Sequence, residues 1–405
     1  MLNVNNQANK KNLIIIANAA LGKGMSGSDR IFIELSKKLK NKLNITVCVW
    51  EEGFEMCQRQ GLIGVTFSKW FLGSLRNLPF AICYFYRIIS GIYYAFKLNI
   101  PKEESKNYFI YSASDFFQDF IPFLVLKIRY PKARFISSLY LAAPNPIFGY
   151  RKEYEKKIQI PKLKDIYFYF SQLLPKFLIP KISNYIFVTS KPDKDYFIKK
   201  GFNSKKIIVI TGGVDFNKYK DFSAPKEKEF DCIFYGRFHP QKGVIEIIDI
   251  WKILVTKLPK AKLAMIGDGP LFNDVKQKIS EYGLDKNIFL KGHMDDSTEK
   301  LRIFGSSKIV VHPAVYDSGG MASAEVMYLK IPGISFDLDS LKTYYPKGML
   351  KVEKFNFNKF SETILKLLND KKLYDQLAIQ AKECVLENFS WDKKAQELLD
   401  QVFDN

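Results

Sequence analysis

Two carboxylates and two glycines lie close together in the second half of the chain. Asp317 precedes Ser318, Gly319 and Gly320, and Glu325 follows with seven residues between the carboxylates. An apolar run at 309–311 comes before this loop, and helix-forming residues (321–330) come after it. The first N–H groups of a helix have no intrahelical partner, and glycine lets an anion approach the backbone closely. The pattern therefore predicts a sugar-nucleotide site, in which backbone amides (Gly319, Gly320, Met321, Ala322) bind the diphosphate and the carboxylates bind hydroxyls.

Two basic residues lie in another glycine-containing loop, 236–243, which reads GRFHPQKG. The apolar run FDCIFY (230–235) precedes it, and the sequence predicts a helix from about Val244. Arg237 and Lys242 would offer two fixed cations to a departing diphosphate, next to Gly236.

Together these stretches resemble the retaining glycosyltransferases of the GT-B fold, family 4, which share a G-R-x4-K-G element followed by E-x7-E. The resemblance covers nearly the whole chain. It implies an α/β fold with two doubly wound Rossmann-like domains facing each other across a cleft. It also implies a nucleotide-sugar donor, a glycan or lipid-linked acceptor, and no metal or other cofactor. The chain departs from the family at Asp317, where Glu is usual, and at 339–345, where a Gly-Gly loop is usual.

The resemblance extends to shorter motifs along the chain. Gly27-Ser28-Asp29-Arg30 is similar to the family's G-x-E-R, which implies that Gly27 meets the donor and that Ser28 and Asp29 meet the acceptor. Tyr140 stands where many members have a histidine near the reacting sugar, and its hydroxyl could bind a sugar but would be a poor base at pH 7. The remaining donor-binding positions implied by the family motifs are Gly269, in a G-x-G-P turn, and His293 and Met294, near the nucleotide base.

Two other motifs favour different chemistry. Residues 22–27 read G-x-G-x-x-G, which taken alone favours a dinucleotide, but the first glycine comes about five residues after the strand instead of directly. Asp337-Leu338-Asp339 matches the D-x-D of metal-dependent transferases, which have another fold. Only three histidines occur and none is paired at ligand spacing, so no metal site is predicted.

Length and composition indicate a globular chain of two domains. The 405 residues exceed one ordinary core, and the predicted divisions are 1–217, a linker at 218–228, 229–387, and a helix at 388–405 that crosses back to the first domain. The net charge of +20 favours an acidic partner, but no nucleic-acid-binding motif is present. Five scattered cysteines without CxxC pairs favour a reducing cytoplasm. Neither a signal peptide nor a transmembrane helix is predicted.

Two aromatic and basic stretches, 69–99 and 164–181, have two interpretations. Each is a helix packed against the sheet, or each lies in the interface of an anionic membrane, with aromatic rings among the headgroups and basic residues on phosphates. Arg87 lies in the middle of the first stretch, which opposes spanning but suits a helix lying flat.

The prediction is therefore a cytoplasmic glycosyltransferase, in peripheral contact with the inner face of the membrane, that serves cell-surface polysaccharide or glycoconjugate synthesis. The proposed step is a front-face displacement in which the leaving phosphate takes the acceptor's proton. Two alternatives stay open: a nucleotide-sugar 2-epimerase and a non-catalytic nucleotide-binding subunit of a glycosylation complex.

Overall fold

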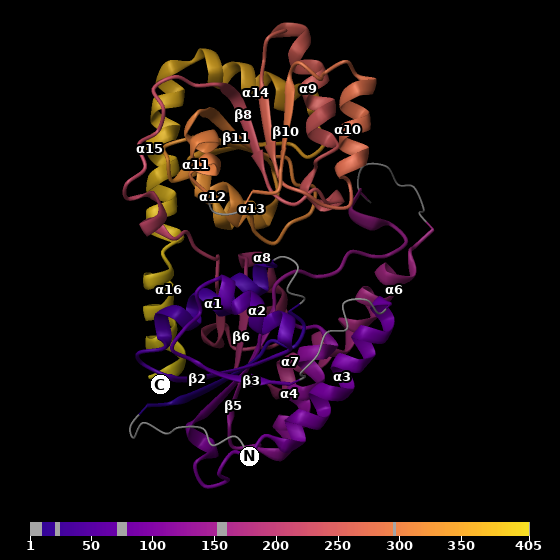
Figure 1. Cartoon of the computed structure of the whole chain (residues 1–405), viewed down its shortest axis with the longest axis vertical. Helices are drawn as coiled ribbons and strands as arrows, with labels where there is room; N and C mark the ends of the chain where they lie inside the picture. Colours follow the sequence, from indigo (N-terminus) through magenta and orange to yellow (C-terminus); the bar gives the residue numbers. More distant parts are fainter. Residues whose placement is uncertain (1–9, 21–24, 71–78, 152–159, 295–296, 405) are drawn as a thin grey trace. The chain divides into compact units, whose positions relative to one another are not determined.

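The computed structural model describes residues 10–404 apart from 21–24, 71–78, 152–159 and 295–296. The chain divides into two compact units, and Figure 1 traces it through both. The first unit comprises residues 1–146, 160–212 and 391–405, and the second comprises 147–159 and 213–390. Each unit has its own parallel sheet.

The described part of the first unit contains a seven-stranded parallel sheet in the order β3-β2-β1-β4-β5-β6-β7. Its inner strands are mostly apolar, because a strand covered by helices on both faces buries nearly all of its side chains, whereas Thr66 at the start of the edge strand is exposed. The strands are β1 (Asn12–Ile16), β2 (Asn44–Val49), β3 (Thr66–Lys69), β4 (Tyr108–Ser112), β5 (Arg134–Leu139), β6 (Tyr185–Val188) and β7 (Ile207–Val209).

Helices cover both faces of this sheet. They are α1 (Gly27–Leu39), α2 (Glu51–Arg59), α3 (Phe80–Lys97), α4 (Phe117–Arg129), α6 (Leu163–Ser171), α7 (Leu173–Ile182), α8 (Lys191–Lys199) and α16 (Trp391–Leu398). Leu13 and Ile15 of β1 join the core formed with α1, α2 and α16. Ile14 and Ile16 join the opposite core, formed with α3, α4, α7 and α8. This alternation follows from the two-residue period of a strand.

Residues distant in sequence complete the first of these cores. Trp391 and Leu398 of α16, with Val402 and Phe403 just beyond it, are buried beside α1 and β4. The ring of Phe403 lies 4.8 Å from that of Phe109, centroid to centroid. The segment 391–403 is therefore part of the core of the first unit.

The described part of the second unit contains a six-stranded parallel sheet in the order β10-β9-β8-β11-β12-β13. The strands are β8 (Phe230–Tyr235), β9 (Leu263–Ile266), β10 (Ile288–Gly292), β11 (Ser307–His312), β12 (Gly333–Phe336) and β13 (Met349–Val352). The helices are α9 (Glu246–Lys257), α10 (Phe272–Glu281), α11 (Thr298–Gly305), α12 (Met321–Met327), α13 (Asp339–Tyr344), α14 (Phe357–Asn369) and α15 (Lys371–Asn388).

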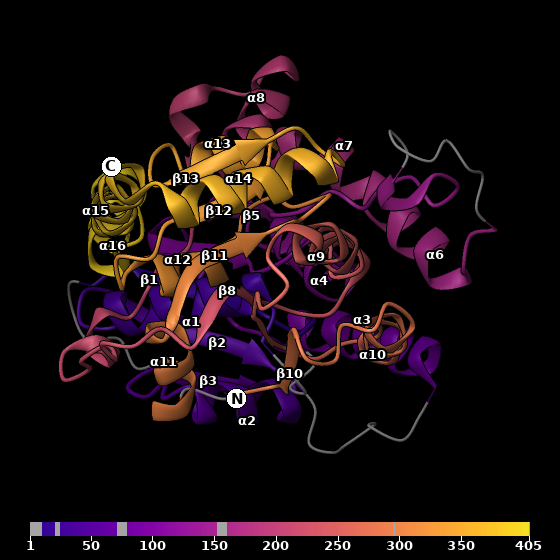
Figure 2. The same ribbon diagram turned by 90° about the horizontal axis from the view of Figure 1, so that it is seen from above.

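This sheet is also covered on both faces. Cys232 and Phe234 of β8 join the core made with α9, α10 and α14, whereas Phe230 and Ile233 join the core made with α11, α12 and α15. Figure 2 shows α11, α12 and α15 to the left of the sheet and α9 and α10 to its right. The predicted fold class, α/β with two doubly wound parallel sheets, is confirmed.

The division between the units falls at Gly212 and Gly213, before the linker predicted at 218–228. Val214 and Tyr219 pack into the core of the second unit, and the Val214 N–H donates to the Phe389 carbonyl at 2.8 Å. The predicted linker therefore folds with the second unit, as do residues 388–390.

The predicted aromatic helix is α3, and one of its faces packs on α4. Gly91 permits this close approach, because a Cβ there would lie 2.6 Å from Cγ of Pro122. Within the described residues, no helix combines the length and the apolar character needed to cross a membrane.

Candidate active site

The candidate site lies in the second unit, at the carboxyl ends of β8 and β11. These two strands pair in parallel in the middle of the sheet. Chain order runs outward from β8 through β9 and β10, and in the other direction from β11 through β12 and β13. Such a change of direction is where open α/β sheets bind their ligands. Both loops singled out in the sequence start here.

Gly243 allows the two loops to touch. Its φ is +69°, which favours glycine, and a Cβ on it would lie 1.7 Å from the Pro313 carbonyl oxygen. The preceding residue, Lys242, is thereby brought to the loop after β11. Its Nζ lies 2.5 Å from Oδ2 of Asp317.

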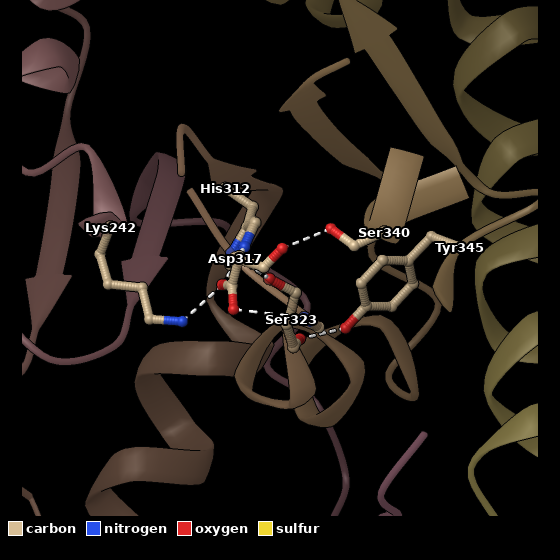
Figure 3. A network of polar contacts seen from close by, with 8 residues as sticks. Lys242, His312, Asp317, Ser323, Ser340 and Tyr345 are labelled. Carbon is tan, nitrogen blue, oxygen red and sulfur yellow. Dashed lines mark hydrogen bonds and ion pairs between the residues drawn. The ribbon is translucent and has the colours of Figure 1, made fainter. Parts of the chain in front are cut away.

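Asp317 is a buried carboxylate surrounded by donors. Besides Lys242, its Oδ2 lies 3.3 Å from Nε2 of His312, and its Oδ1 accepts the Gly319 N–H at 3.2 Å (Figure 3). Burial alone raises the pKa of Asp317, but the Lys242 charge and the His312 contact outweigh it and lower the pKa to about 2. The group is therefore ionised at neutral pH.

His312 is neutral in this network. Burial lowers the pKa of its imidazole, although Asp317 acts in the opposite direction. Nδ1 lies 3.2 Å from the Ser323 hydroxyl. With one ring proton, the consistent arrangement has Nε2–H donating to Asp317 and Nδ1 accepting from Ser323. His312 thus links β11 to α12 and orients the carboxylate.

Residues 339–345, which stand where the family has a Gly-Gly loop, contact the loop that carries Asp317. They form α13, from which the Ser340 hydroxyl donates to the Asp317 carbonyl at 2.5 Å. The Tyr345 hydroxyl donates to the Gly320 carbonyl (Figure 3). The Tyr344 ring packs against Gly319, where a Cβ would lie 2.3 Å from Cζ of that ring. The segment that departs from the family pattern therefore contacts the loop that carries Asp317 through two hydrogen bonds and one aromatic ring.

A cavity of about 30 Å³ lies between these loops. Its size suits one water-sized group, such as a single phosphate oxygen. Five predicted residues line it together, Gly236, Lys242, Gly320, Met321 and Ala322, with Phe234, Tyr235 and His312.

Other predicted residues border this area. Arg237 is exposed immediately after Gly236. Gly269 has a φ of +156° and a Cβ on it would lie 2.5 Å from the Phe238 carbonyl oxygen, so the G-x-G-P turn packs closely on the loop after β8. His293 is exposed and Met294 half-buried, both following β10, two strands away from β8.

Glu325 lies on α12 and is 5% exposed. Its Oε2 is 3.5 Å from Nζ of Lys300, a residue of α11 that is itself buried and lies 5.3 Å from the ring centre of Tyr235. Sequence reasoning missed Lys300, as it missed Ser323, Ser340 and Tyr345. Lys300 belongs to no recognisable motif and lies on a helix like many other lysines of the chain, so the sequence does not indicate that it is buried beside Glu325.

An aromatic group also borders the site. The rings of His239 and Tyr316 each lie 5.6 Å, centroid to centroid, from the ring of Tyr150, which belongs to the 147–159 segment of the second unit. His239 precedes the turn that carries Lys242, and Tyr316 precedes Asp317. No sequence motif indicates this contact.

The residues predicted in the first unit are engaged locally. Ser26 caps α1, and the Asp29 carboxylate accepts from its N–H at 2.9 Å and from its hydroxyl at 2.7 Å. Burial raises the pKa of Asp29. Ser28 contacts the Ser26 hydroxyl at 2.8 Å, and Gly27 is exposed. Of the G-x-G-x-x-G motif, residues 22–24 lie outside the described chain.

Tyr140 is directed into the protein. Its side chain is 8% exposed, and its hydroxyl lies 2.6 Å from that of Tyr111. A sugar that binds the Tyr140 hydroxyl would have to compete with this contact.

The D-x-D carboxylates lie elsewhere. Asp337 and Asp339 are each 3.2 Å from Nζ of Lys342, so both carboxylates form ion pairs with this exposed lysine. Among the described residues, no three His, Cys, Asp or Glu side chains gather closely enough to hold a metal ion.

Comparison with known proteins relates the second unit to a family of glycosyl transferases. Residues 215–384, within the second unit, match the family model described as glycosyl transferases group 1. A poly(ribitol-phosphate) alpha-N-acetylglucosaminyltransferase of Staphylococcus aureus is 26% identical over 219 residues, covering 52% of this chain and 42% of the relative. A poly(glycerol-phosphate) alpha-glucosyltransferase of Bacillus subtilis is 25% identical over 163 residues, covering 39% and 24%. The matched region spans less than half the length of each relative.

Solved structures share the fold of the whole chain. The structure of a mutant of S. aureus TarM in complex with fondaparinux, alpha-GlcNAc-glycerol and UDP superimposes with a TM-score of 0.73 at 14% identity, covering 98% of this chain and 100% of TarM. The chain has the GT-B fold, and its residues 215–384 match the family model of glycosyl transferases group 1.

Proposed function

We propose that the chain is a retaining glycosyltransferase of family 4. It moves a sugar from a UDP- or GDP-sugar to a glycan or lipid-linked acceptor in cell-surface polysaccharide or glycoconjugate synthesis. The observation that carries this proposal is the placement of Lys242 beside Gly236 and Gly320 around one small cavity at the switch point of the sheet. The family match and the names of the relatives support it.

The cations would act on the departing diphosphate. An ammonium carries three N–H donors, so Lys242 can hold Asp317 with one and a phosphate oxygen with another. Arg237 is exposed on the same loop and would add a planar, bidentate donor. Charge that develops on the leaving oxygen in the transition state meets cations that are already in place.

The transfer step needs no protein nucleophile. The bond from the anomeric carbon to the phosphate oxygen breaks, and the bond from that carbon to the acceptor oxygen forms on the same face. The acceptor's hydroxyl proton passes to the leaving phosphate oxygen. The products are a nucleoside diphosphate and a glycoside of unchanged anomeric configuration.

The two carboxylates would hold hydroxyl groups. Asp317 is fixed by His312 and Lys242, and we assign it to a hydroxyl of the transferred sugar. We assign Glu325 to the ribose, with Lys300 holding its carboxylate in position. The remaining donor contacts, Gly27, Gly269, Gly319, Met321, Ala322, His293 and Met294, and the acceptor contacts Ser28, Asp29 and Tyr140, stand as proposals on the family motifs.

We also propose that catalysis needs no metal ion, because Arg237 and Lys242 supply the cationic charge. Activity should then survive a chelator and should not rise when Mg²⁺ or Mn²⁺ is added. The location we propose is the cytoplasm at the inner face of the membrane, which the scattered, mostly buried thiols fit.

The test is a screen of UDP- and GDP-sugars in two steps. The first measures which nucleotide raises the melting temperature, because a ligand that binds only the native state stabilises it. The second measures release of nucleoside diphosphate from that donor with and without a membrane extract that contains acceptors. Acceptor-dependent release supports transfer. If release persists at the full rate in both Arg237→Ala and Lys242→Ala variants, the assignment of the cations is wrong.

A non-catalytic nucleotide-binding subunit is the second candidate function. It is favoured by the ion pair between Lys242 and Asp317 and by the inward hydroxyl of Tyr140, each of which engages a predicted contact. Such a protein would gain stability with nucleotide but would release none when acceptor is added. A 2-epimerase would instead change the donor without any acceptor.

A further inference from the structure

Helix α3 exposes a continuous apolar face. Its exposed positions recur at three- and four-residue intervals, which places them on one side of the helix. Six large apolar side chains make up this face, named here the α3 face: Ile82 (52% exposed), Phe85 (59%), Tyr86 (43%), Ile89 (65%), Tyr93 (50%) and Phe96 (60%). Soluble proteins seldom leave apolar patches of this extent uncovered unless the patch binds something.

The exposed side of this helix is apolar, whereas its central cation is buried. The helix has one cation along its middle, Arg87, and this residue points inward and is 5% exposed. Its guanidinium donates to the Ala20 carbonyl at 2.9 Å and lies 3.6 Å from Glu52. An ordinary surface helix has its charges outside and its apolar side chains inside, so burial within this unit does not explain the α3 face.

The neighbouring helices α6 and α7 also expose large apolar side chains. α6 packs on α3 through the rings of Tyr84 and Tyr167, whose centroids are 4.4 Å apart, and Figure 1 shows the two helices close together. α6 exposes Leu163 (82%) and Phe170 (58%), and α7, which contacts α6, exposes Phe177 (61%).

Lysines lie beside these aromatic rings. Nζ of Lys97, at the end of α3, lies 4.4 Å from the ring centre of Tyr93. Nζ of Lys181, at the end of α7, lies 3.5 Å from that of Phe177. A lysine whose stem lies along apolar surface while its ammonium stays in a polar zone is suited to the level of lipid headgroups.

We infer that the α3 face docks flat on a membrane that contains anionic lipid, with the aromatic and aliphatic side chains among the headgroups and Lys97 and Lys181 on phosphates. The net charge of +20 favours an anionic surface and disfavours a second copy of the same basic chain as the occupant. This inference deepens the proposed function and rests on it only for the idea that the acceptor is found at the membrane.

The test is flotation of the full chain with phosphatidylcholine vesicles, with and without phosphatidylglycerol, in the absence of nucleotide and acceptor. We expect binding to the anionic vesicles that weakens at high salt. Ile89→Glu should lower the partition constant at least about tenfold, because it places a charge in the centre of the α3 face. Ile379→Glu is the matched control: Ile379 is 54% exposed on α15 of the second unit, and its substitution should leave binding within about twofold.

Three results would overturn the inference. The first is an absence of binding to anionic vesicles by the wild-type chain. The second is equal binding by the wild type and by Ile89→Glu, provided both melt at similar temperatures. The third is a wild-type dimer in solution that Ile89→Glu converts to a monomer, since a second copy would then cover the face. Because no sugar donor is present, failure here is independent of glycosyl transfer.

Discussion

Two buried aspartates, one in each unit, differ in charge although they occupy similar places. Asp317 follows β11 in the second unit, and Asp119 lies in the first turn of α4, after β4, in the first unit. Asp317 has Lys242 at 2.5 Å and a pKa of about 2. Asp119 accepts from the Ala19 N–H at 2.7 Å and the Ser114 hydroxyl at 2.5 Å, and burial raises its pKa to about 8 despite these hydrogen bonds.

The difference teaches what each unit is suited to bind. A carboxylate stays ionised in a protein interior where a cation accompanies it, and takes up a proton where only neutral donors do. The second unit therefore maintains an ionic site, which suits a diphosphate. In the first unit the Asp119 carboxyl accepts from the neutral Ala19 N–H and Ser114 hydroxyl, which suits the uncharged hydroxyl acceptor proposed above.

The sharpest way to break this comparison is to remove the cation. Lys242→Met keeps the volume and should lower the rate of acceptor-dependent nucleotide release about 100- to 1000-fold, because a fixed charge beside the leaving group is lost. Lys278→Met is the matched control, since Lys278 also pairs with a carboxylate, at 2.7 Å from Asp249, and is 20% exposed against 21% for Lys242. A Lys242→Met enzyme as fast as the Lys278→Met enzyme would contradict the assignment.

Asp119→Asn tests the neutral half of the comparison. The pKa of about 8 in the folded state exceeds the value near 4 of an unfolded aspartate, so the folded state holds the proton more tightly. This stabilisation is complete below about pH 4 and is lost as the pH rises to about 8. Relative to the wild type, the variant should gain on the order of 5 kcal/mol in free energy of unfolding across that range. Urea unfolding at several pH values measures it, and a pH-independent difference would mean that Asp119 is ionised.

Asp317→Asn tests the ionic half, and the sign is opposite. The folded pKa of about 2 lies below the unfolded value near 4, so the stabilisation is present above about pH 4 and is lost as the pH falls towards 2. Between pH 5 and pH 2 the wild type should lose about 2 kcal/mol more than the variant. The same substitution in a Lys242→Met background should show a smaller pH dependence, and an unchanged one would show that Lys242 does not hold the charge.

Tyr345→Phe tests the ionic site of the second unit with a smaller expected effect. It removes the donor to the Gly320 carbonyl and should cost about 1 kcal/mol of stability. It should also raise KM for the donor a few-fold with kcat little changed, because the loop is less well held. Tyr374→Phe removes a comparable hydrogen bond, to the Lys308 carbonyl at 2.9 Å, and should reduce stability without altering KM. Equal KM values in the two variants would remove Tyr345 from the site.

The sequence predicted the parts of the site that follow strands. The loops at 236–243 and 313–320 each come after an apolar run, and parallel pairing of β8 with β11 brings them together. Lys242 and Asp317 could therefore be assigned to one place although they are far apart in sequence. Their direct ion pair could not be predicted, because it depends on the close approach of Gly243 to Pro313.

Residues that contact the site from neighbouring helices were not predicted. Ser340 and Tyr345 lie in a segment that matches no motif, and Lys300 reaches Glu325 from a neighbouring helix. The orientation of Tyr140 also depends on tertiary packing, since only the neighbouring strand supplies Tyr111. The outward apolar face of α3 did have a sequence signal, because Arg87 falls on the side of the helix opposite Ile89.

The place of residues 391–403 affects how the protein is made. A ribosome synthesises the strands of the first unit, then residues 213–390 of the second unit, and only afterwards Trp391, Leu398, Val402 and Phe403, which pack in a core beside β1 and β4. During translation one face of the earlier sheet is therefore covered by α1 and α2 but still lacks α16, while the later sheet is already able to fold. The N-terminal half should mature last, and a message truncated just before these codons would yield a finished second unit attached to an unfinished first one.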